Sequence, residues 1–238
     1  MLTISIVTHN QLDIMSNLLE NILENTGFNL IITINTNEDE TILSNYPSNR
    51  LTIIRNQKPL GFTRNHNNAF KLCKTDYFLV LNPDVKIENS LINNILSEMI
   101  KYSLPILSPI AKSNDGKILD NGRMYPKVFT PILRLISDKY RTDYIFTKSN
   151  IYKVDWISGM FIMIKSDVFS DLNGFDERFF LYYDDVDLCR RANESGYNVS
   201  LTTKYSVIHE GNRLSKKSIK YFLIHLYSLF KYHLKHGL

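Results

Sequence analysis

The hydrophobic residues of this chain repeat with two different periods, and these periods alternate along its first hundred residues. Short β-branched apolar runs predict strands at Leu2–Val7, Leu30–Ile34, Leu51–Arg55 and Phe78–Leu81. Apolar residues at helical spacing predict helices over residues 12–23, 63–73 and 90–102. Strands that alternate with helices are typical of a parallel sheet with helices on its faces. The pattern therefore predicts an α/β fold.

The pattern of the second half is less regular. Residues 113–123 contain Asn-Asp-Gly and Asn-Gly, which are turn signals and predict a hairpin, whereas residues 127–153 follow no defined period. A helix is predicted over 185–192, stopped by Gly196, and another over 215–235. Because no linker-like stretch divides the sequence, we predict one domain over residues 1–214, with a basic amphipathic helix at 215–238 belonging to it.

Composition and charge narrow the class of protein. Of 238 residues, 44% are hydrophobic and 22% are charged, which excludes a disordered or fibrous chain. The net charge of +4 is too small, and the charges too scattered, to predict a nucleic acid partner. The two cysteines, Cys73 and Cys189, lie in predicted helices, which favours a reducing compartment over disulfides. Without a recognisable export signal or apolar span, we expect a cytoplasmic protein.

Polar residues follow the predicted strands, at the edge of a parallel sheet where ligands bind. The strongest signal among them is Asn82-Pro83-Asp84, because a rigid proline would hold Asp84 at the end of a buried strand. A carboxylate oxygen fixed there suits a hard divalent cation that takes its other ligands from a diphosphate. The alternative is an ordinary Pro-Asp turn.

A second signal is the acidic start of the predicted helix near residue 185. Asp184, Asp185 and Asp187 crowd its first turn, where the helix dipole keeps carboxylates ionised. Helix capping explains one of them, most simply Asp187 paired with Arg190 or Arg191. Four aromatic residues precede this turn: Phe179, Phe180, Tyr182 and Tyr183. Partial removal of water would raise the basicity of a carboxylate, as a general base for a hydroxyl requires.

Two further segments carry candidate chemistry. His209 follows the short apolar stretch at 206–208 and could complete a metal site begun by Asp84, although a structural histidine is the alternative. A glycine-bearing loop with Arg213 and Lys216 follows it and could fold over phosphates. Residues 61–67 open a helix after a strand, and both its N-terminus and Arg64 attract anions. The glycine patterns of dinucleotide and P-loop sites are absent from the sequence, which excludes both readings.

Seven segments, taken in order, resemble family 2 glycosyltransferases of the GT-A fold, and more narrowly their rhamnosyltransferase-like branch. The resemblance covers residues 2–215 and is carried by residues 4–10, 61–67, 81–85, 156–159, 174–180, 184–189 and 208–209. It implies a Rossmann-like, mostly parallel sheet flanked by helices. It also implies the inverting transfer of a sugar from a nucleotide diphosphate donor to an acceptor hydroxyl.

The resemblance further implies roles for individual residues. The nucleoside would be bound by Thr8, Asn10 and Asn35, and the rest of the donor by Arg64, Asn67, Asn82 and Asp84. A divalent cation, Mg²⁺ or Mn²⁺, would rest on Asp84 and His209. Asp185 would be the catalytic base, with Asp184 where a glutamate is common, and Trp156 and Gly159 would line the acceptor and sugar site. Since Asn82 and Asn35 each replace a common aspartate, weak metal affinity and either a uracil or a thymine nucleotide are expected.

Several substrates and partners stay open from sequence. The first expectation is dTDP-rhamnose with a bacterial surface-polysaccharide or lipid-linked saccharide acceptor, and the alternative donor is a UDP-hexose. Two alternatives come from other classes, namely an inactive carbohydrate-binding protein and a nucleotidyltransferase. A nucleotidyltransferase should carry a glycine-rich, lysine-containing loop after the first strand, and this sequence has Thr8-His-Asn-Gln there. The basic aromatic helix over 215–235 could contact the inner face of the cell membrane, the alternatives being core packing or a dimer contact.

Overall fold

The computed structural model describes residues 1–24, 27–46, 49–127, 144, 146, 150–209 and 218–237. The strands of its main sheet are β1 (Leu2–Thr8), β2 (Phe28–Ile34), β3 (Leu51–Arg55), β4 (Tyr77–Leu81), β5 (Val85–Lys86), β6 (Ile106–Lys112), β7 (Ile118–Leu119), β9 (Ile151–Lys153), β11 (Phe161–Lys165) and β12 (Val199–His209). A small second sheet pairs β8 (Gly122–Arg123) with β10 (Trp156–Ile157). The helices are α1 (Ser16–Leu23), α2 (Phe62–Phe70), α3 (Leu91–Lys101), α5 (Ser166–Asp171), α6 (Asp184–Glu194) and α8 (Ile219–His236), with 3-10 turns η1 (Leu12–Met15) and η2 (Thr41–Asn45).

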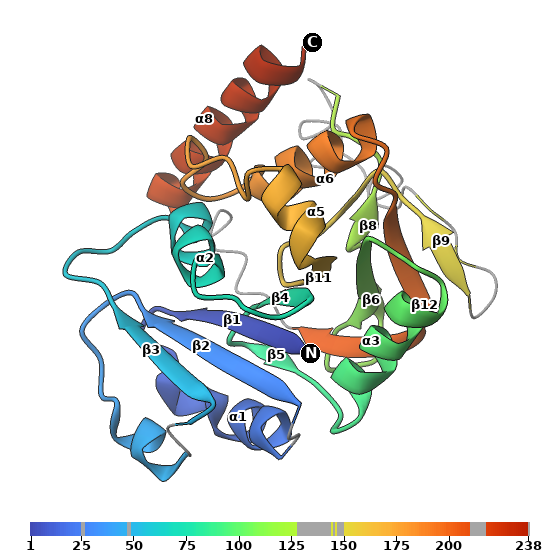
Figure 1. The fold of residues 1–238 in the computed structure, drawn as a ribbon. Coiled ribbons are helices and arrows are strands. Elements are labelled where there is room, and N and C mark those ends of the chain that lie inside the picture. Colours follow the sequence, from blue (N-terminus) through green and yellow to red (C-terminus); the bar gives the residue numbers. More distant parts are fainter. Residues whose placement is uncertain are drawn as a thin grey trace.

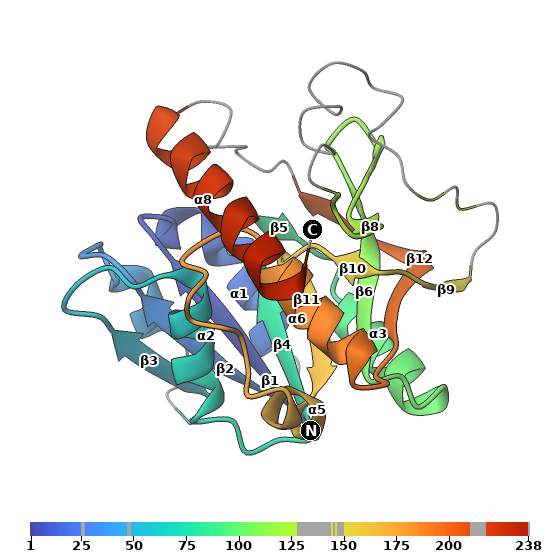
Figure 2. The same cartoon turned by 90° about the horizontal axis from the view of Figure 1, so that it is seen from above.

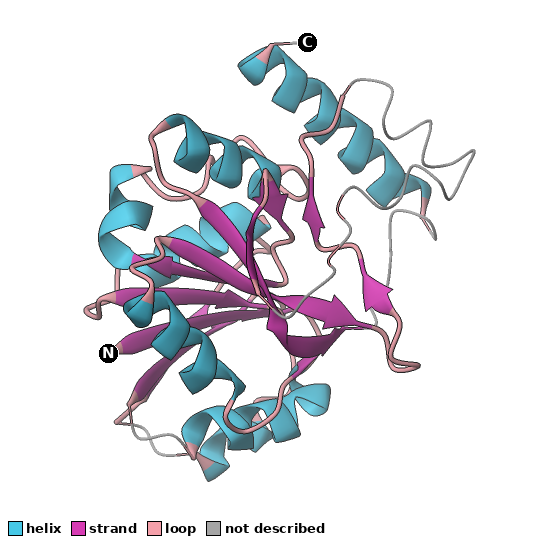
Figure 3. Cartoon of the chain, turned by 90° about the vertical axis from the view of Figure 1, so that its right-hand side faces the viewer, coloured by secondary structure: helices cyan, strands magenta, loops and turns pink. Residues whose placement is uncertain are grey.

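The main sheet has the strand order β3-β2-β1-β4-β11-β6-β12-β5, and helices cover both of its faces (Figures 1 and 3). Its first four strands are parallel, as the alternation of strands and helices predicts. The strand β11 runs antiparallel to its neighbours β4 and β6, and β6 is parallel to β12. The predicted α/β class with a mostly parallel, helix-flanked sheet is thus confirmed.

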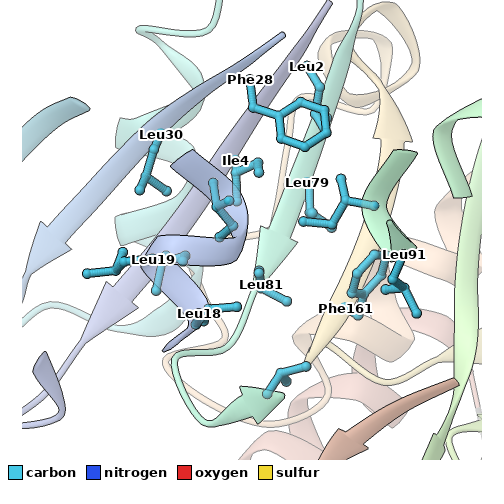
Figure 4. Packing of buried hydrophobic residues seen from close by; sticks show 14 of the residues in the cluster. Leu2, Ile4, Leu18, Leu19, Phe28, Leu30, Leu79, Leu81, Leu91 and Phe161 are labelled. Carbon is cyan, nitrogen blue, oxygen red and sulfur yellow. The ribbon is translucent and has the colours of Figure 1, made fainter. Parts of the chain in front are cut away.

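The central strand β1 shows why the apolar runs become buried strands. Alternate residues Leu2, Ile4 and Ile6 point to one face of the sheet and pack against apolar residues of α1 such as Leu19 (Figure 4). On the other face, the hydroxyl of Ser5 lies 2.8 Å from Nδ1 of the buried His66 in α2. Burial lowers the pKa of His66 to about 3, so this histidine stays neutral and serves packing.

One central strand, β6, was not predicted, because Pro109 lies in the middle of it. Proline has no N–H to give to a neighbouring strand, and a sequence run that contains it does not look like a central strand. The structure accommodates Pro109 through its neighbours. The pairing of β12 with β6 shifts register between Thr202 and Ser206, opposite Pro109. The side-chain amide of Asn121 donates to Pro109 O and accepts from Ala111 N, both at 2.9 Å.

The C-terminal helix α8 packs against α6 and the segment that precedes it (Figure 2). It begins at Ile219, within the predicted range of 215–235, and the predicted boundary at residues 214 and 215 lies outside the described residues. Arg213 and Lys216 also lie outside them. Within the described ranges, none of the helices combines the length and the apolarity needed to cross a membrane.

Candidate active site

The Asn82–Asp84 turn and His209 meet because of strand pairing. The turn follows β4, and the short strand β5 that comes next pairs antiparallel with the end of β12, so that Val85 lies opposite His209. This register brings Nε2 of His209 to 3.3 Å from Oδ1 of Asp84. The two side chains are 17% and 22% exposed, respectively. They are therefore close enough to share a ligand and open enough to receive one.

The chemistry of this pair fits a divalent cation. A carboxylate oxygen and an imidazole nitrogen are accepted ligands of Mn²⁺-like ions, and ions of this type commonly take phosphate oxygens as well. The described residues hold no group of three or more His, Cys, Asp or Glu side chains arranged for a metal. A cation here would rest on Asp84 and His209, and a bound diphosphate would have to complete its coordination.

Asp185 lies at the start of α6 and reaches back to the loop before β11. Its Oδ2 accepts a hydrogen bond from Gly159 N, and its Oδ1 accepts one from Val186 N, both at 2.9 Å. Burial raises the pKa of Asp185, while these two hydrogen bonds and the positive charge of Arg123 oppose the rise. A carboxylate that is held in place and made more basic is suited to accept a proton from a hydroxyl.

The same short segment connects Asp185 with the Asn82–Asp84 turn. Because β4 and β11 are antiparallel neighbours, Asn82 N donates to Met160 O at 2.9 Å. The preceding residue, Gly159, is the one that donates to Asp185. Asp185 and the acidic turn therefore flank two consecutive residues, although they lie about a hundred positions apart in the chain.

A side chain at position 159 would lie at ordinary contact distance from two neighbours. A Cβ added there would stand 3.4 Å from the ring of Phe62 and 3.7 Å from the Asp185 carboxylate. The neighbouring Trp156 donates from its indole to Met124 O at 2.9 Å, and the guanidinium of Arg123 lies 5.5 Å from its ring centroid. Both residues that the sequence assigns to the acceptor and sugar site therefore lie on the strand and turn that contact Asp185.

Asp184 is the more deeply buried of the two helix-start carboxylates, with 5% of its surface exposed. Burial, reinforced by the negative charge of Asp185, raises its pKa well above the ordinary value. The carboxyl group of Asp184 therefore holds its proton more tightly in the folded protein than in the unfolded chain. The stability that the carboxyl contributes is complete below its unfolded-state pKa and is lost as the pH rises through its folded-state pKa.

We therefore expect Asp184→Asn to stabilise the protein at neutral pH. An amide has no proton to lose, so its Tm should exceed that of the wild type by about 3 °C, the shift that roughly 1 kcal/mol produces in a chain of this size. The gain should shrink as the pH is lowered, since Asp184 itself then becomes neutral. Thermal unfolding of both proteins across acid and neutral pH measures this, and a Tm difference that does not change with pH would contradict it.

The residues predicted at the nucleoside lie at the carboxyl ends of β1 and β2. Asn10 adopts a left-handed backbone with φ of 59°, and its Oδ1 accepts from the Thr36 hydroxyl. Asn35 accepts from Leu60 N at 2.8 Å and donates to Leu60 O at 3.0 Å, which fixes the loop after β3. Asn35 also lines a pocket of about 240 Å³, together with Thr36, Asn37, Glu40, Arg55 and Asn56. This pocket offers polar groups around a small concave space, and Asn35 is the one residue among the three predicted at the nucleoside that lines it.

Arg64 and Asn67 on α2 face the segment that precedes α6. Arg64 Nε pairs with Glu177 at 2.9 Å, and the Asn67 side chain accepts from Phe175 N and donates to Phe175 O, both at 2.9 Å. Gly174 is part of this contact, because a Cβ there would come within 2.5 Å of Asn67 Oδ1. These contacts give both side chains a structural task, and their part in donor binding stays a prediction.

Two residues near the site have no role assigned from the sequence. Glu38 accepts hydrogen bonds from the Thr8 hydroxyl and from the backbone N–H groups of Gln11 and Leu12, so it fixes the turn after β1. Its only signal in the sequence is its place after a predicted strand. Arg123 influences Asp185 from a strand of two residues, and nothing in the local sequence marks that proximity.

Comparison with known proteins identifies the family. The family model for Glycosyl transferase family 2 matches residues 3–168. "Rhamnosyltransferase WbbL" of Escherichia coli (strain K12) is 28% identical over 250 residues, which cover 98% of this chain and 92% of that protein. The "N-acetylglucosaminyl-diphospho-decaprenol L-rhamnosyltransferase" of Mycobacterium tuberculosis (strain ATCC 25618 / H37Rv) is 25% identical over 145 residues, or 56% of this chain and 47% of that protein.

A solved structure shows the same fold. The mannosyltransferase PcManGT from Pyrobaculum calidifontis, in complex with GDP-Man and Mn²⁺, matches 100% of this chain and 65% of its own with a TM-score of 0.67. Its sequence identity of 15% supports a shared GT-A architecture and nothing finer. The family model, in contrast, spans more than half of the sequence. The chain therefore belongs to glycosyl transferase family 2.

Proposed function

We propose that this protein is a metal-dependent inverting glycosyltransferase that moves rhamnose from dTDP-rhamnose to a hydroxyl of a bacterial surface-polysaccharide precursor. The observation that carries the proposal is that Asp185 and the turn that carries Asp84, with His209 beside it, are bound to two consecutive residues, Gly159 and Met160. The relatedness to rhamnosyltransferase WbbL over nearly the whole chain supports rhamnose as the sugar. The name of the mycobacterial relative supports a lipid-linked saccharide as the acceptor.

The reaction follows from the position of Asp185. Its carboxylate accepts the proton of the acceptor hydroxyl while the hydroxyl oxygen forms a bond to the anomeric carbon of the donor sugar. The bond from that carbon to the diphosphate breaks, and its electron pair leaves with the diphosphate oxygen. Attack occurs on the face opposite the leaving group, so a single displacement inverts the configuration. A carboxylate nucleophile, as used by retaining glycosidases, is not required.

The other residues bind and orient the donor. Asn35 and its pocket would hold the nucleoside, and Asp84 with His209 would hold the divalent cation. When bound, that cation neutralises negative charge on the leaving diphosphate. Gly159 N fixes the orientation of Asp185 before the acceptor arrives, so no side-chain rotation is needed during the reaction.

A donor panel tests this function. The protein is incubated with dTDP-rhamnose, UDP-hexoses and GDP-mannose, each with Mn²⁺ and a lipid-linked saccharide acceptor, and the released nucleotide is measured. We expect release from dTDP-rhamnose above all. Release from a UDP-hexose alone would keep the enzyme class and change the donor. Binding of saccharide without release from any donor would instead identify an inactive carbohydrate-binding protein.

We also propose that α8 contacts the anionic inner surface of the cell membrane, where a lipid-linked acceptor would be presented. Its outer face carries exposed large apolar side chains: Ile219, Phe222, Leu223, Leu226, Tyr227, Phe230 and Leu234. These positions follow helical spacing and form one continuous stripe. Between residues 219 and 236 there are three lysines and three histidines and no acidic residue. Lys235 and His236 pair with Asp187 inside the protein, so it is the apolar stripe together with Lys220 and Lys231 that fits an interfacial, anionic lipid surface.

Substitution on this stripe tests the membrane contact. The double variant Tyr227→Ser with Phe230→Ser should lower binding to phosphatidylglycerol vesicles by about tenfold per ring removed from the lipid. Each of these two side chains is 60% exposed, so the fold should be unchanged. Ile118→Ser, at a 54% exposed apolar position on β7, is the matched control. The proposal would be overturned if the wild-type protein did not bind the vesicles but formed a dimer, and if the double variant were a monomer.

A further inference from the structure

The residues immediately before Asp184 adopt an unusual backbone. Tyr182 and Tyr183 have φ values of 67° and 63°, so two consecutive aromatic residues occupy the left-handed region. Residues with a Cβ rarely adopt this region, and bulky ones do so only when the surrounding structure holds them there. The helix that carries Asp184 and Asp185 begins directly after this turn. The contacts that hold the two tyrosines therefore also determine the position of the first residues of α6.

On one side, the turn is held by α2. The hydroxyl of Thr63 donates to Phe179 O at 2.7 Å, and Phe62 N donates to Phe180 O at 2.9 Å. The approach is so close that a Cβ on Gly61 would stand 2.6 Å from Phe180 O. Phe179 and Phe180, which lead into the turn, thus lie against the beginning of α2.

On the other side, the turn is held by α8. The buried hydroxyl of Ser228 donates to Leu181 O at 2.8 Å. The ring of His225 makes edge contacts with both tyrosines, with centroids 5.2 Å from Tyr182 and 5.2 Å from Tyr183. The burial of His225 lowers its pKa, so the ring packs in its neutral form.

The same helix is also fixed to α6, on the far side of the two carboxylates. The fully buried Asp187 lies 2.5 Å from Lys235 Nζ and 2.7 Å from His236 Nε2, and it pairs with Arg191 at 2.8 Å. Arg190 donates to His236 O at 3.0 Å. The contacts of α8 therefore lie both before and after Asp184 and Asp185 in the chain.

From this arrangement we infer that α8 is a positioning element for the catalytic base, and that Ser228 and His225 are the positioning residues through which it acts on the Leu181–Tyr183 turn. This inference rests on the proposed function in one respect, namely that Asp185 is the base. Neither Ser228 nor His225 touches the reacting groups. Their effect is to hold the left-handed turn that sets where α6 begins.

The test compares Ser228→Ala and His225→Ala with a matched control. We expect both variants to lower kcat for dTDP-rhamnose by about tenfold, because small displacements of a catalytic group are costly in rate. The donor KM should change by less than about twofold, since the donor-binding residues are untouched. His225→Phe, which keeps an aromatic ring, should recover most of the loss. Ser97→Ala, which removes a hydroxyl that donates to Asn93 O on α3, should behave like the wild type.

Amide hydrogen exchange gives a second readout that does not depend on turnover. In Ser228→Ala, residues 182–186 should exchange faster than in the wild type, while the strands β1 and β4 keep their protection. Unchanged exchange together with unchanged kcat would overturn the inference. If no donor is turned over by the wild type, the proposed function fails, and the exchange measurement still decides whether α8 holds the turn.

Discussion

Asp185→Asn is expected to lower kcat by about 10³-fold while leaving donor affinity unchanged, because the amide cannot accept the acceptor proton. Its carbonyl oxygen can still accept a hydrogen bond from Gly159 N or Val186 N, so the start of α6 should keep its structure. Steady-state rates measure the loss in kcat, and calorimetric titration with dTDP-rhamnose measures the donor affinity.

The matched control for this substitution is Asp167→Asn. Asp167 lies in the first turn of α5, where its Oδ1 accepts from Val168 N as Asp185 accepts from Val186 N. It is exposed and should have no effect on rate. In the wild type, the rate should fall on acidification with a midpoint above pH 3.8, the ordinary pKa of aspartate, because burial raises the pKa of Asp185. Full activity of Asp185→Asn would remove this residue from the mechanism.

Asp84→Ala is expected to abolish the response to Mn²⁺ and to lower kcat/KM by about 10²-fold. Asp84 supplies the anionic member of the two-residue pair, and a lone His209 binds a divalent cation weakly. In a thermal-shift experiment, Mn²⁺ with dTDP should raise the Tm of the wild type and not that of the variant, since a ligand that binds only the folded state stabilises it.

Asp76→Ala provides the control for this second substitution. Asp76 lies just before β4, and Asp84 lies after the same strand. The carboxylate of Asp76 is exposed and forms an ion pair with the N-terminal amine at 3.0 Å. Removing that carboxylate tests for a general effect of losing an acidic side chain next to this strand. Wild-type turnover that persists in EDTA at the same rate would contradict a metal requirement altogether.

Local periodicity was sufficient to predict the first half of the fold. The predicted strands over 2–7, 30–34, 51–55 and 78–81 agree with β1 to β4 within two residues at each end. The predicted stop at Gly196 is also confirmed, since its φ is 86° and Tyr197 N returns to Ala192 O. These features depend on neighbouring residues alone, which is why the pattern contains them.

The second half depends on distant residues, and there the sequence was less informative. The strand β6 escaped because Pro109 is acceptable only with the register shift in β12 and the amide of Asn121 beside it. Only the last residues of β12, next to His209, were recognised as an apolar stretch. Strand pairings between segments a hundred residues apart leave no local period.

The candidate site divides in the same way. The pairing of Asp187 with Arg191 has helical spacing and was predicted, whereas the contacts of Asp187 with Lys235 and His236 join two helices and were not. The sequence suggested a metal site shared by Asp84 and His209, first from their places after apolar runs and then from a resemblance. In the structure their proximity comes from the pairing of β5 with β12.

The register shift in β12 decides which way the end of that strand faces. The register between β12 and β6 shifts by three residues between Thr202 and Ser206, so the side chains after the shift lie on the opposite face from the one that an unbroken strand would give them. Successive side chains of a strand alternate between its faces, and a shift by an odd number of residues therefore turns His209 toward Asp84. We therefore expect the insertion or deletion of a single residue in this stretch to turn the imidazole to the wrong side of the sheet.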